Sequence, residues 1–336
     1  MTPDWQLNSR AVRLVDDFAH DAASLRIEFH DFPGGGRVFD FGVKAEGSLT
    51  AGLVLARACT SGLADITIVP GDLGCSTETD STPSPLAPRP STLLAWPHIQ
   101  VVTDAPTASS LYSQYAGWQI SVGKFFAMGS GPMRAASARE TVFEKHGYRE
   151  TPDRTVGVLE GSKLPTADVF EYVANKTGVP ADRTTLLIAP TASVAGNLQV
   201  VARVVETCLH KLFELGFDVR RVSSAWGVAP LSPVAKGDLT GIGRTNDSIL
   251  YGGRVSLLVR GDDDSIADVG PRVPACSTAS YGRPFLEIFE AAGRDFYKID
   301  PHLFSPAEVT FQNLDTGRVQ RFGRVALDIV RRSFGL

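Results

Sequence analysis

Two apolar runs in different halves of the chain are each followed by the same five residues, Ala-Pro-Thr-Ala-Ser. HIQVVTD, at residues 98–104, precedes the copy at residues 105–109, and TTLLI, at residues 184–188, precedes the copy at residues 189–193. Short apolar runs that end in turn-forming residues are typical of buried strands. Each copy is therefore predicted to be a loop that begins where a strand ends.

The segments around the two copies follow the same order of helix, strand, loop and helix. Residues 48–64 have helical periodicity and lead into the strand DITIVP, while residues 165–188 give a helix, a turn and a strand. Gln114 and Gln199 follow the two copies at nearly equal offsets. The pattern predicts an α/β protein with mixed sheets, in two lobes of similar construction with a cleft between them. Chance agreement of five common loop residues is the alternative.

The lobes are assigned to residues 1–150 and to residues 151–336, the second including strands that close the chain. The opening residues 1–25 mix charged and apolar positions at helical spacing, and a β-hairpin is predicted around Gly34–Gly36. A second hairpin turn is predicted at Asp315–Gly317.

Two stretches are predicted to be irregular. Thr77–Pro97 is rich in Pro, Ser and Thr, so it is expected to be a solvated loop, although its PxxP spacing would also suit a protein partner. GDDDSIAD, at residues 261–268, is expected to be a charged loop before a helix around FLEIFEAA. No chemistry is assigned to either stretch.

Composition and charge exclude several classes of function. The chain has 336 residues, 43% of them hydrophobic, and a net charge of −4 without a broad basic face, so nucleic acid is not an expected partner. No run is long enough to span a bilayer, and the start lacks the apolar core of a secretory signal. The four cysteines form no CxxC pair, which favours reduced thiols and a cytoplasmic location.

The common cofactor and metal motifs are missing from the sequence. The six histidines show neither HxH nor HExxH spacing, so no metal site is predicted. The glycines before Lys124 do not have the spacing of a phosphate-binding loop, and Phe125 stands where that loop needs Ser or Thr. There is no GxSxG nucleophile motif.

Two polar segments remain as candidate binding sites. Gly129, Ser130 and Gly131 precede Pro132 in a sharp turn whose backbone N–H groups suit an anion at a helix start, although such turns are often only structural. The second segment, directly before a predicted strand, is dense in hydrogen-bonding groups, for which a solvated loop is the alternative. Its polar residues are Arg244, Thr245, Asn246 and Asp247.

A third candidate lies on the helix predicted after the second copy of Ala-Pro-Thr-Ala-Ser. Arg203, Glu206 and His210 are spaced three and four residues apart, so they share one face of a helix. A surface ion pair, contributing less than about 1 kcal/mol, is the simplest interpretation. The flanking valines leave little solvent-facing surface, however, and a buried ion pair is costly unless it has a function.

Five segments together resemble methenyltetrahydromethanopterin cyclohydrolase, in the right order along the chain. In chain order they are SQYAGW, GSGPMRAA, APTASVAGNLQVVARVVETCLHK, GRTNDSILYGG and DFYKIDPHLFSPAE. The sequence departs from the family pattern in the Pro-rich segment Thr77–Pro97 and in the first Ala-Pro-Thr-Ala-Ser. Neither departure touches the helix of Arg203 and Glu206.

The resemblance implies a cytoplasmic homotrimer whose subunits bind a reduced pterin between two α/β lobes, with no metal or dissociable cofactor. It also implies that water adds reversibly to a methenyl bridge to give the N5-formyl carrier. Arg203 and Glu206 match the catalytic pair of the family. The remaining site residues implied by the matching segments are Thr191, Ser193, Gly129, Ser130, Gly131, Arg134, Arg244, Thr245, Asn246, Asp247 and Lys298.

The chemistry of the reaction suits these residues. The methenyl carbon is already an electrophile, so Glu206 needs only to remove a proton from the attacking water. Arg203 is expected to lower the pKa of Glu206 and to share its hydrogen bonds with water or substrate. Arg134, Arg244 and Lys298 are candidate partners for acid groups on the tail of the carrier.

Two alternatives stay open at this point. One is a non-catalytic relative that binds or stores a reduced pterin, although a binding protein has no need of a base such as Glu206. The other is a cyclohydrolase that acts on a folate. Neither the structure of the carrier tail nor the physiological direction follows from the sequence.

Overall fold

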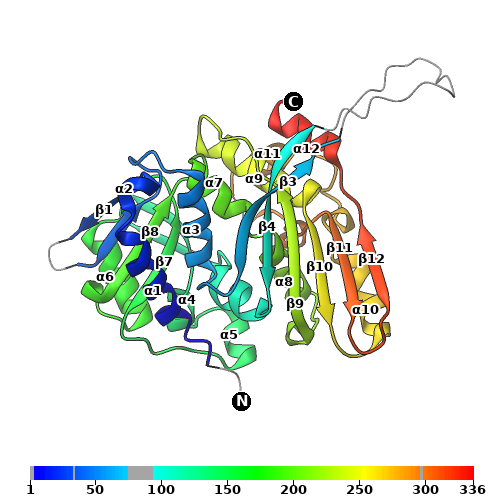
Figure 1. The fold of residues 1–336 in the computed structure, drawn as a ribbon, viewed down its shortest axis with the longest axis horizontal. Helices are drawn as coiled ribbons and strands as arrows, with labels where there is room; N and C mark the ends of the chain where they lie inside the picture. Colours follow the sequence, from blue (N-terminus) through cyan, green and yellow to red (C-terminus); the bar gives the residue numbers. More distant parts are fainter. Residues whose placement is uncertain (1–3, 33–34, 75–93, 296–297) are drawn as a thin grey trace.

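The computed structural model describes residues 4–32, 35–74, 94–295 and 298–336. Within them, two six-stranded mixed sheets stand side by side (Figure 1). The first sheet has the order β1 (Glu28–Asp31), β2 (Arg37–Asp40), β8 (Thr184–Ala189), β7 (Thr155–Glu160), β6 (Phe125–Ser130) and β5 (Trp118–Val122). The second has the order β12 (Val319–Gly323), β11 (Glu308–Asn313), β10 (Arg254–Val259), β9 (Val222–Pro230), β4 (Ala95–Thr103) and β3 (Asp65–Asp72). The predicted α/β class with mixed sheets is confirmed.

The pairing directions explain why both sheets are mixed. In the first sheet β2, β8 and β7 run parallel to one another, while β1, β6 and β5 are antiparallel to their neighbours. In the second sheet only β10 and β11 are parallel. β8 is buried along its whole length, as expected for a parallel strand covered on both faces.

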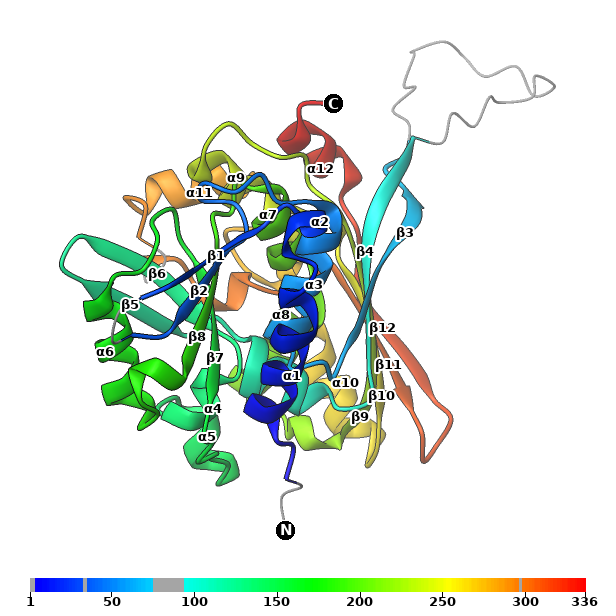
Figure 2. The same cartoon turned by 60° about the vertical axis from the view of Figure 1, so that its left-hand side comes forward.

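A helical layer fills the space between the two sheets (Figure 2). It contains α1 (Leu7–Ala19), α3 (Leu49–Cys59), α7 (Val194–Val201), α8 (Val204–Glu214) and the π-helix η1 (Thr107–Gln114). α3 packs against β7 of the first sheet and β3 of the second, and α8 packs against β9 and β10. α6 (Ala167–Thr177) covers the outer face of the first sheet, while no helix of the described chain covers the outer face of the second.

α3 and α7 approach each other closely because a glycine faces the contact. Ser48 caps the start of α3 by accepting a hydrogen bond from the N–H of Ala51. A Cβ atom added at Gly52 would lie 2.9 Å from Cβ of Leu198 in α7. The two helix backbones can therefore come together only where this side chain is missing.

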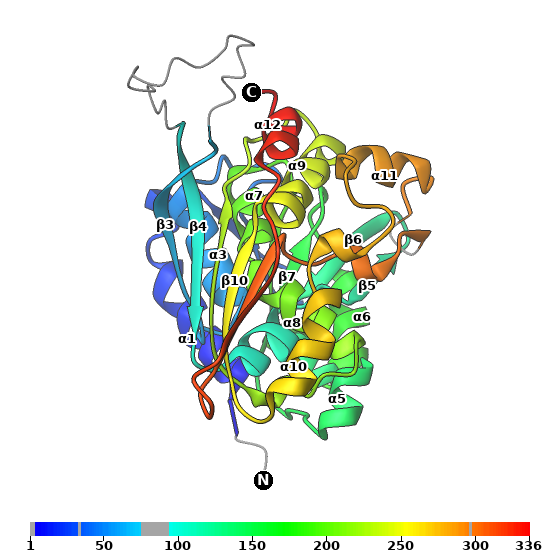
Figure 3. The same cartoon turned by 90° about the vertical axis from the view of Figure 1, so that its right-hand side faces the viewer.

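Three further helices pack together at one end of the molecule (Figure 3). They are α9 (Asp238–Gly252), α11 (Phe285–Ala291) and α12 (Leu327–Phe334), and α9 contacts both of the others. The remaining helices are short: α2 (Ala22–Leu25), α4 (Met133–Ser137), α5 (Thr141–His146), α10 (Asp263–Val269), η2 (Ala181–Arg183), η3 (Val219–Arg221), η4 (Gly270–Arg272), η5 (Ala275–Ser277) and η7 (Pro301–Leu303).

Most of the predicted elements are present. The opening helix is α1, the first hairpin joins β1 to β2, and the last hairpin joins β11 to β12, with Gly317 at a φ of +75° in its turn. The second Ala-Pro-Thr-Ala-Ser begins with the last residue of β8 and forms the loop before α7, as predicted, whereas residues 107–109 of the first copy are not a loop but the first residues of η1. The two preceding strands belong to different sheets, however: β4 lies in the second sheet and β8 in the first.

A segment for which a loop was the alternative is helical, and so is one predicted loop. Residues 244–247 lie inside α9, and the acidic segment at residues 261–268 contains most of α10, which Asp262 caps by accepting from the N–H of Ser265. Residues 77–93 of the Pro-rich segment lie outside the described residues, and Ala95–Pro97 begin β4 rather than ending a loop.

The predicted boundary between residues 150 and 151 does not coincide with the division between the sheets. β2 pairs with β8, so the first sheet combines strands from both sides of this boundary. β4 pairs with β9, so the second sheet does the same. The assignment of lobes to these two segments stays a prediction.

Candidate active site

Arg203 and Glu206 lie where two helices of the central layer meet. The single helix predicted here is interrupted: α7 ends at Val201, and Arg203 is the N-cap of α8. Glu206 is in the first turn of α8, and its Oε2 atom lies 4.0 Å from Nη1 of Arg203. The two side chains therefore face each other, as their spacing predicts.

This pair is buried, so the interpretation as a surface ion pair is wrong. Arg203 is 5% exposed and Glu206 is 4% exposed. Arg203 donates hydrogen bonds to the backbone oxygen of Gln114 and, over 3.1 Å, to Oγ of Ser130. Its Nε atom has no hydrogen-bond partner among the described residues. Arg203 therefore bonds to Gln114 and Ser130 while one of its buried N–H donors has no partner among the described residues.

Burial sets the charge state of Glu206. Removal from water raises the pKa of this carboxyl to about 7, and the charges of Arg203 and Arg134 oppose the rise. The predicted influence of Arg203 has the right sign, but burial outweighs it. A carboxylate with a pKa near neutrality is well matched to accept a proton from water at physiological pH.

Polar side chains that follow the two copies of Ala-Pro-Thr-Ala-Ser meet beside Arg203. Gln114, at the end of η1, donates to the backbone oxygen of Ala202 over 3.1 Å. Gln199, in α7, donates to Sγ of Cys59 over 3.5 Å, and this sulfur lies 3.4 Å from Oγ of Ser130. The sequence signals for this cluster were the nearly equal offsets of the two glutamines and the turn that contains Ser130, whereas Cys59 gave none.

Arg134 is close enough to Glu206 to affect its pKa, and its guanidinium lies over aromatic rings. Its guanidinium carbon is 4.8 Å from the centre of the Tyr115 ring, which stacks on His210 with 4.4 Å between ring centres. Arg134 is fully buried, and its Nε lies 2.8 Å from Oε1 of Glu140. Burial lowers the pKa of His210 to about 4, so this ring is neutral. The assignment of Arg134 to the carrier tail gains no support from this buried position.

The turn at residues 129–131 contacts Arg203 through Ser130. Gly129 and Ser130 end β6, and Gly131 turns the chain with a φ of +85°. The N–H of Gly131 donates to the backbone oxygen of Ser113 over 2.8 Å, so it is not free for an anion. What Ser130 contributes is the oxygen that receives Arg203.

The loop of the second Ala-Pro-Thr-Ala-Ser joins β8 to α7. Ser193 caps α7 by accepting from the N–H of Gly196 over 3.0 Å, and Thr191 donates to Glu160 at the end of β7. Gly241 of α9 packs directly on this loop, since a Cβ there would lie 3.1 Å from the N atom of Ala192. Thr191 borders a pocket of about 270 Å³ at the ends of β7 and β8.

The polar residues of α9 hold helices together. Thr245 and Asn246 donate to backbone oxygens of the preceding turn of α9, and Asp247 accepts from the N–H of Phe285 over 2.8 Å. Arg244 donates to the backbone oxygen of Ser333 in α12. None of these bonds reaches Arg203 or Glu206, so their role in substrate binding stays a prediction.

Lys298 is the last of the predicted site residues. Its Nζ lies 3.9 Å from a carboxylate oxygen of Asp295, and both side chains are exposed. No contact joins it to Arg203 or Glu206, and its assignment to the carrier tail stays a prediction.

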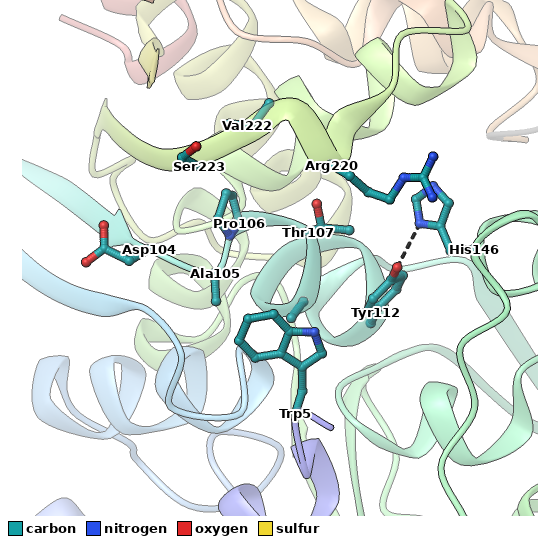
Figure 4. A pocket seen from close by; sticks show the side chains of 11 residues that line it. Trp5, Asp104, Ala105, Pro106, Thr107, Tyr112, His146, Arg220, Val222 and Ser223 are labelled. Atoms are coloured by element: carbon teal, nitrogen blue, oxygen red, sulfur yellow. Dashed lines mark hydrogen bonds between the residues drawn. The ribbon is translucent and has the colours of Figure 1, made fainter. Parts of the chain in front are cut away.

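A larger pocket, of about 480 Å³, is lined in part by the first Ala-Pro-Thr-Ala-Ser (Figure 4). Tyr112 and His146 face each other on one side of it, with 2.8 Å between Oη and Nδ1. Its charged groups already have partners: Arg220 pairs with Asp218, and Asp104 accepts from Ser224. Neither Arg203 nor Glu206 lines this pocket.

Two kinds of feature are missing from the described residues. No group of three or more His, Cys, Asp or Glu side chains within them is arranged to hold a metal ion. In the same part of the chain, no helix has the length and apolar character that crossing a membrane requires.

Comparison with known sequences identifies the family of the chain. The family model described as Cyclohydrolase (MCH) matches residues 6–334. The methenyltetrahydromethanopterin cyclohydrolase of Rhodopirellula baltica is 48% identical over 90% of this chain and 87% of the relative. Those of Methylobacillus flagellatus and Methanothermobacter thermautotrophicus are 40% and 39% identical, over 96% and 98% of this chain and 93% and 99% of the relatives. The chain belongs to the methenyltetrahydromethanopterin cyclohydrolase family.

Proposed function

We propose that Arg203 and Glu206 catalyse the reversible hydrolysis of the methenyl bridge of 5,10-methenyltetrahydromethanopterin to the N5-formyl carrier. The observation that carries this assignment is the buried carboxylate of Glu206, which has a pKa of about 7 and faces a buried arginine at 4.0 Å. Such a group accepts a proton readily, and its negative charge also favours a cationic substrate.

The reaction proceeds by addition and ring opening. Water attacks the methenyl carbon, whose positive charge is shared by two nitrogens, while Glu206 takes one proton from that water. The bond from this carbon to N10 then breaks, N10 receives a proton, and the hydroxyl loses its proton to become the formyl group. The net reaction consumes one water and releases one proton. Arg203 keeps Glu206 oriented between these two proton transfers.

Replacing Glu206 tests this assignment directly. Glu206→Gln keeps the shape of the side chain but removes its basicity, so turnover should fall by about 10²- to 10⁴-fold. Turnover is followed by the decay of the methenyl chromophore, and the melting temperature is measured on the same samples. A stable variant with normal turnover would exclude Glu206 as the base.

Two other functions make different predictions in the same assay. A non-catalytic pterin-binding protein would bind the carrier without accelerating the decay, and the Arg203–Glu206 pair argues against it because binding needs no base. A folate cyclohydrolase would hydrolyse the folate derivative faster than the methanopterin derivative. Running the assay with each carrier separates these cases.

We also propose that catalysis needs no metal, because the methenyl carbon is already electrophilic. Hydrolysis should continue in buffer that contains a chelator, and loss of activity that one metal restores would contradict this proposal. A cytoplasmic location remains a prediction from cysteine usage.

Association into a homotrimer, implied by the resemblance, is proposed to use the outer face of the second sheet. Val102 of β4 lies opposite Trp226 of β9, and each is 37% exposed on the face that no helix of the described chain covers (Figure 2). Two large apolar side chains side by side on an open sheet are suited to contact another copy of the chain.

A further inference from the structure

Each turnover of the proposed reaction leaves one proton on a group that solvent hardly reaches. The addition of water to the methenyl bridge releases one proton in the net balance, and Glu206, which takes it, is 4% exposed. A protonated carboxyl cannot accept a second proton, so Glu206 has to lose the first one before it can act as a base again. The reaction therefore requires a route from this buried carboxyl to the surface.

Titratable side chains continue from Glu206 along one face of α8. Glu206, His210 and Glu214 follow one another at intervals of four residues, so they share this face of the helix. Their exposure rises in the same order: Glu206 is buried, the side chain of His210 is 18% exposed, and that of Glu214 is 45% exposed. Nε2 of His210 lies 3.7 Å from Oε1 of Glu214. The face thus leads from the proposed base to solvent.

A pocket of about 250 Å³, here named the α8 pocket, opens beside this face. It is lined by the partly buried Tyr115 and His210 and by the exposed Arg139 and Glu214, so it is open to solvent and reaches the imidazole ring. A pocket of this size has room for several water molecules. Water can therefore stand in contact with His210.

Buried polar atoms connect the α8 pocket to the Arg203–Glu206 pair. Nε of Arg203, Nη2 of Arg134 and Oε2 of Glu140 are buried and have no hydrogen-bond partner within the described residues. Nε of Arg134 lies 2.8 Å from Oε1 of Glu140, which lines the pocket, and the charge of Arg134 acts on the pKa of Glu206. Buried polar atoms of this kind are normally satisfied by water. Water from the pocket can therefore approach Glu206 along these atoms.

His210 is suited to pass a proton on without keeping it. Burial lowers the pKa of this imidazole to about 4, and the charges of Arg134 and His302 act in the same direction. No hydrogen bond of the described residues occupies either ring nitrogen. Tyr115 stacks on the ring with 4.4 Å between the ring centres. A neutral imidazole has one donor and one acceptor nitrogen, so it can take a proton on one side and release one on the other.

We propose that His210 carries the proton from Glu206 to the α8 pocket. Water beside Glu206 takes its proton and gives one to Nδ1 of His210, while the proton on Nε2 passes to Glu214 or to water in the pocket. These steps move one proton from the carboxyl to solvent and consume nothing, and a half-turn of the imidazole ring restores its first tautomer. The proposal rests on the proposed function, which makes Glu206 the base.

Glu140 is the competing group in the same pocket. Its carboxylate also borders the water route, but it pairs with the fully buried Arg134. A proton on Glu140 would leave that guanidinium buried without its counter-charge, which is costly. His210 is neutral before and after each transfer, so the route through the imidazole leaves no buried charge unpaired. We assign the route to His210 for this reason.

Proton release and hydrolysis, measured together, test this route. In stopped flow, a pH indicator dye reports the released proton and the methenyl chromophore reports hydrolysis of methenyltetrahydromethanopterin. At pH 8, above the pKa of about 7 for Glu206, the wild type in dilute buffer should release protons in step with hydrolysis. In His210→Ala the first turnover should stay fast and its proton should appear late. Steady-state turnover of this variant should fall by about 10- to 100-fold.

Two further variants separate a proton route from a structural role. Imidazole added to His210→Ala should restore turnover, because the missing ring leaves room beside the α8 pocket. His210→Gln fills this space with a side chain that takes no proton, so it should show the same delay without rescue. His20→Ala removes an exposed histidine at the end of α1 and should behave as the wild type does. Melting temperatures of all variants show that they are folded.

The outcomes distinguish this route from the proposed function. Wild-type turnover with prompt proton release in His210→Ala would overturn the route. Slow turnover without a delayed proton, which imidazole does not restore, would overturn it as well and leave His210 a structural role. In both cases an inactive Glu206→Gln would keep Glu206 as the base. Normal turnover in Glu206→Gln would instead overturn the assignment of the base, and the route with it.

Discussion

At the scale of single residues, the proposed active site depends on the negative charge of Glu206, which burial in the fold makes energetically costly. Glu206 is buried beside Arg203, yet the two side chains stay 4.0 Å apart, and Arg203 gives its hydrogen bonds to Gln114 and Ser130. A closer pair would hold Glu206 ionised and make it a weak base. The backbone oxygen of Gln114 and the hydroxyl of Ser130 would thus keep the pKa of Glu206 high, because they accept the hydrogen bonds of Arg203.

Arg203→Lys should expose this tuning in the pH profile. Lysine keeps the positive charge but loses the planar fork that reaches Gln114 and Ser130 together. Turnover should fall less than in Glu206→Gln, and the apparent pKa of the acidic limb should rise. A pH–rate profile of each variant, with melting temperature as the control for folding, measures both effects. An acidic limb at the wild-type position would exclude this role for Arg203.

Stability should depend on the same carboxyl. Because the pKa of Glu206 is raised to about 7 on folding, the native state binds more protons than the unfolded state between the ordinary pKa of 4.5 and about 7. Its contribution to stability is therefore full below this window and is lost as the pH rises through it. From pH 5 to pH 8 the wild type should lose more of its melting temperature than Glu206→Gln does. Equal losses in the two proteins would contradict the raised pKa.

At the scale of elements, the contact between α3 and α7 places the catalytic turn. α7 ends directly before Arg203, so a shift of α7 would move Arg203 relative to Ser130 on β6. The contact is close because Gly52 leaves room for Leu198. The position of Arg203 relative to Ser130 therefore depends on a glycine in a different helix.

Gly52→Ala should destabilise the protein by about 1–3 kcal/mol, since its new methyl group overpacks the contact with Leu198. Urea unfolding of the wild type and the variant gives this free energy. Gly237→Ala is the matched control, because a Cβ there meets nothing within 4 Å. Unchanged stability in Gly52→Ala would mean that α3 and α7 move apart without cost.

Secondary structure was predicted well where the local sequence pattern determines it and less well where contacts between distant segments determine it. α1 and the two hairpins follow from periodicity and turn residues. The acidic segment forms α10 because Asp262 caps it and further aspartates lie in its first turn, where the helix dipole favours negative charge. The prediction missed this helix because it took the run of aspartates as the sign of a solvated loop. Residues of α9 with weak helix propensity are held by side-chain bonds such as that from Thr245 to Gly241.

For the site, the spacing of Arg203 and Glu206 and their valine neighbours predicted a facing, partly buried pair, and the geometry confirms it. The interruption between α7 and α8 and the net rise in the pKa of Glu206 were not predicted. Both depend on groups distant in the sequence, such as Arg134 and Gln114, which only the fold brings to the pair.

At the scale of the whole molecule, we predict that the chain associates into a homotrimer through the uncovered face of the second sheet. Purified protein at micromolar concentration should have a mass close to three chains by light scattering. Trp226→Glu should dissociate it, because a charge would replace an apolar contact. Phe29→Glu, on an exposed strand of the first sheet, should leave the assembly intact. A wild-type monomer would contradict the trimer, and a trimeric Trp226→Glu would contradict this choice of surface.

The pairing of β2 with β8 has a consequence for the synthesis of the chain. Arg37 of β2 lies opposite Thr185 of β8, so the partner of β2 leaves the ribosome long after β2 itself. At about 5–20 residues per second, β8 is synthesised on the order of ten seconds after β2, so the β2 edge of the hairpin stays unpaired for that time. An unpaired edge can recruit strands from other nascent chains during that time. Slower translation between these strands should therefore favour aggregation, and faster translation should favour recovery of folded enzyme.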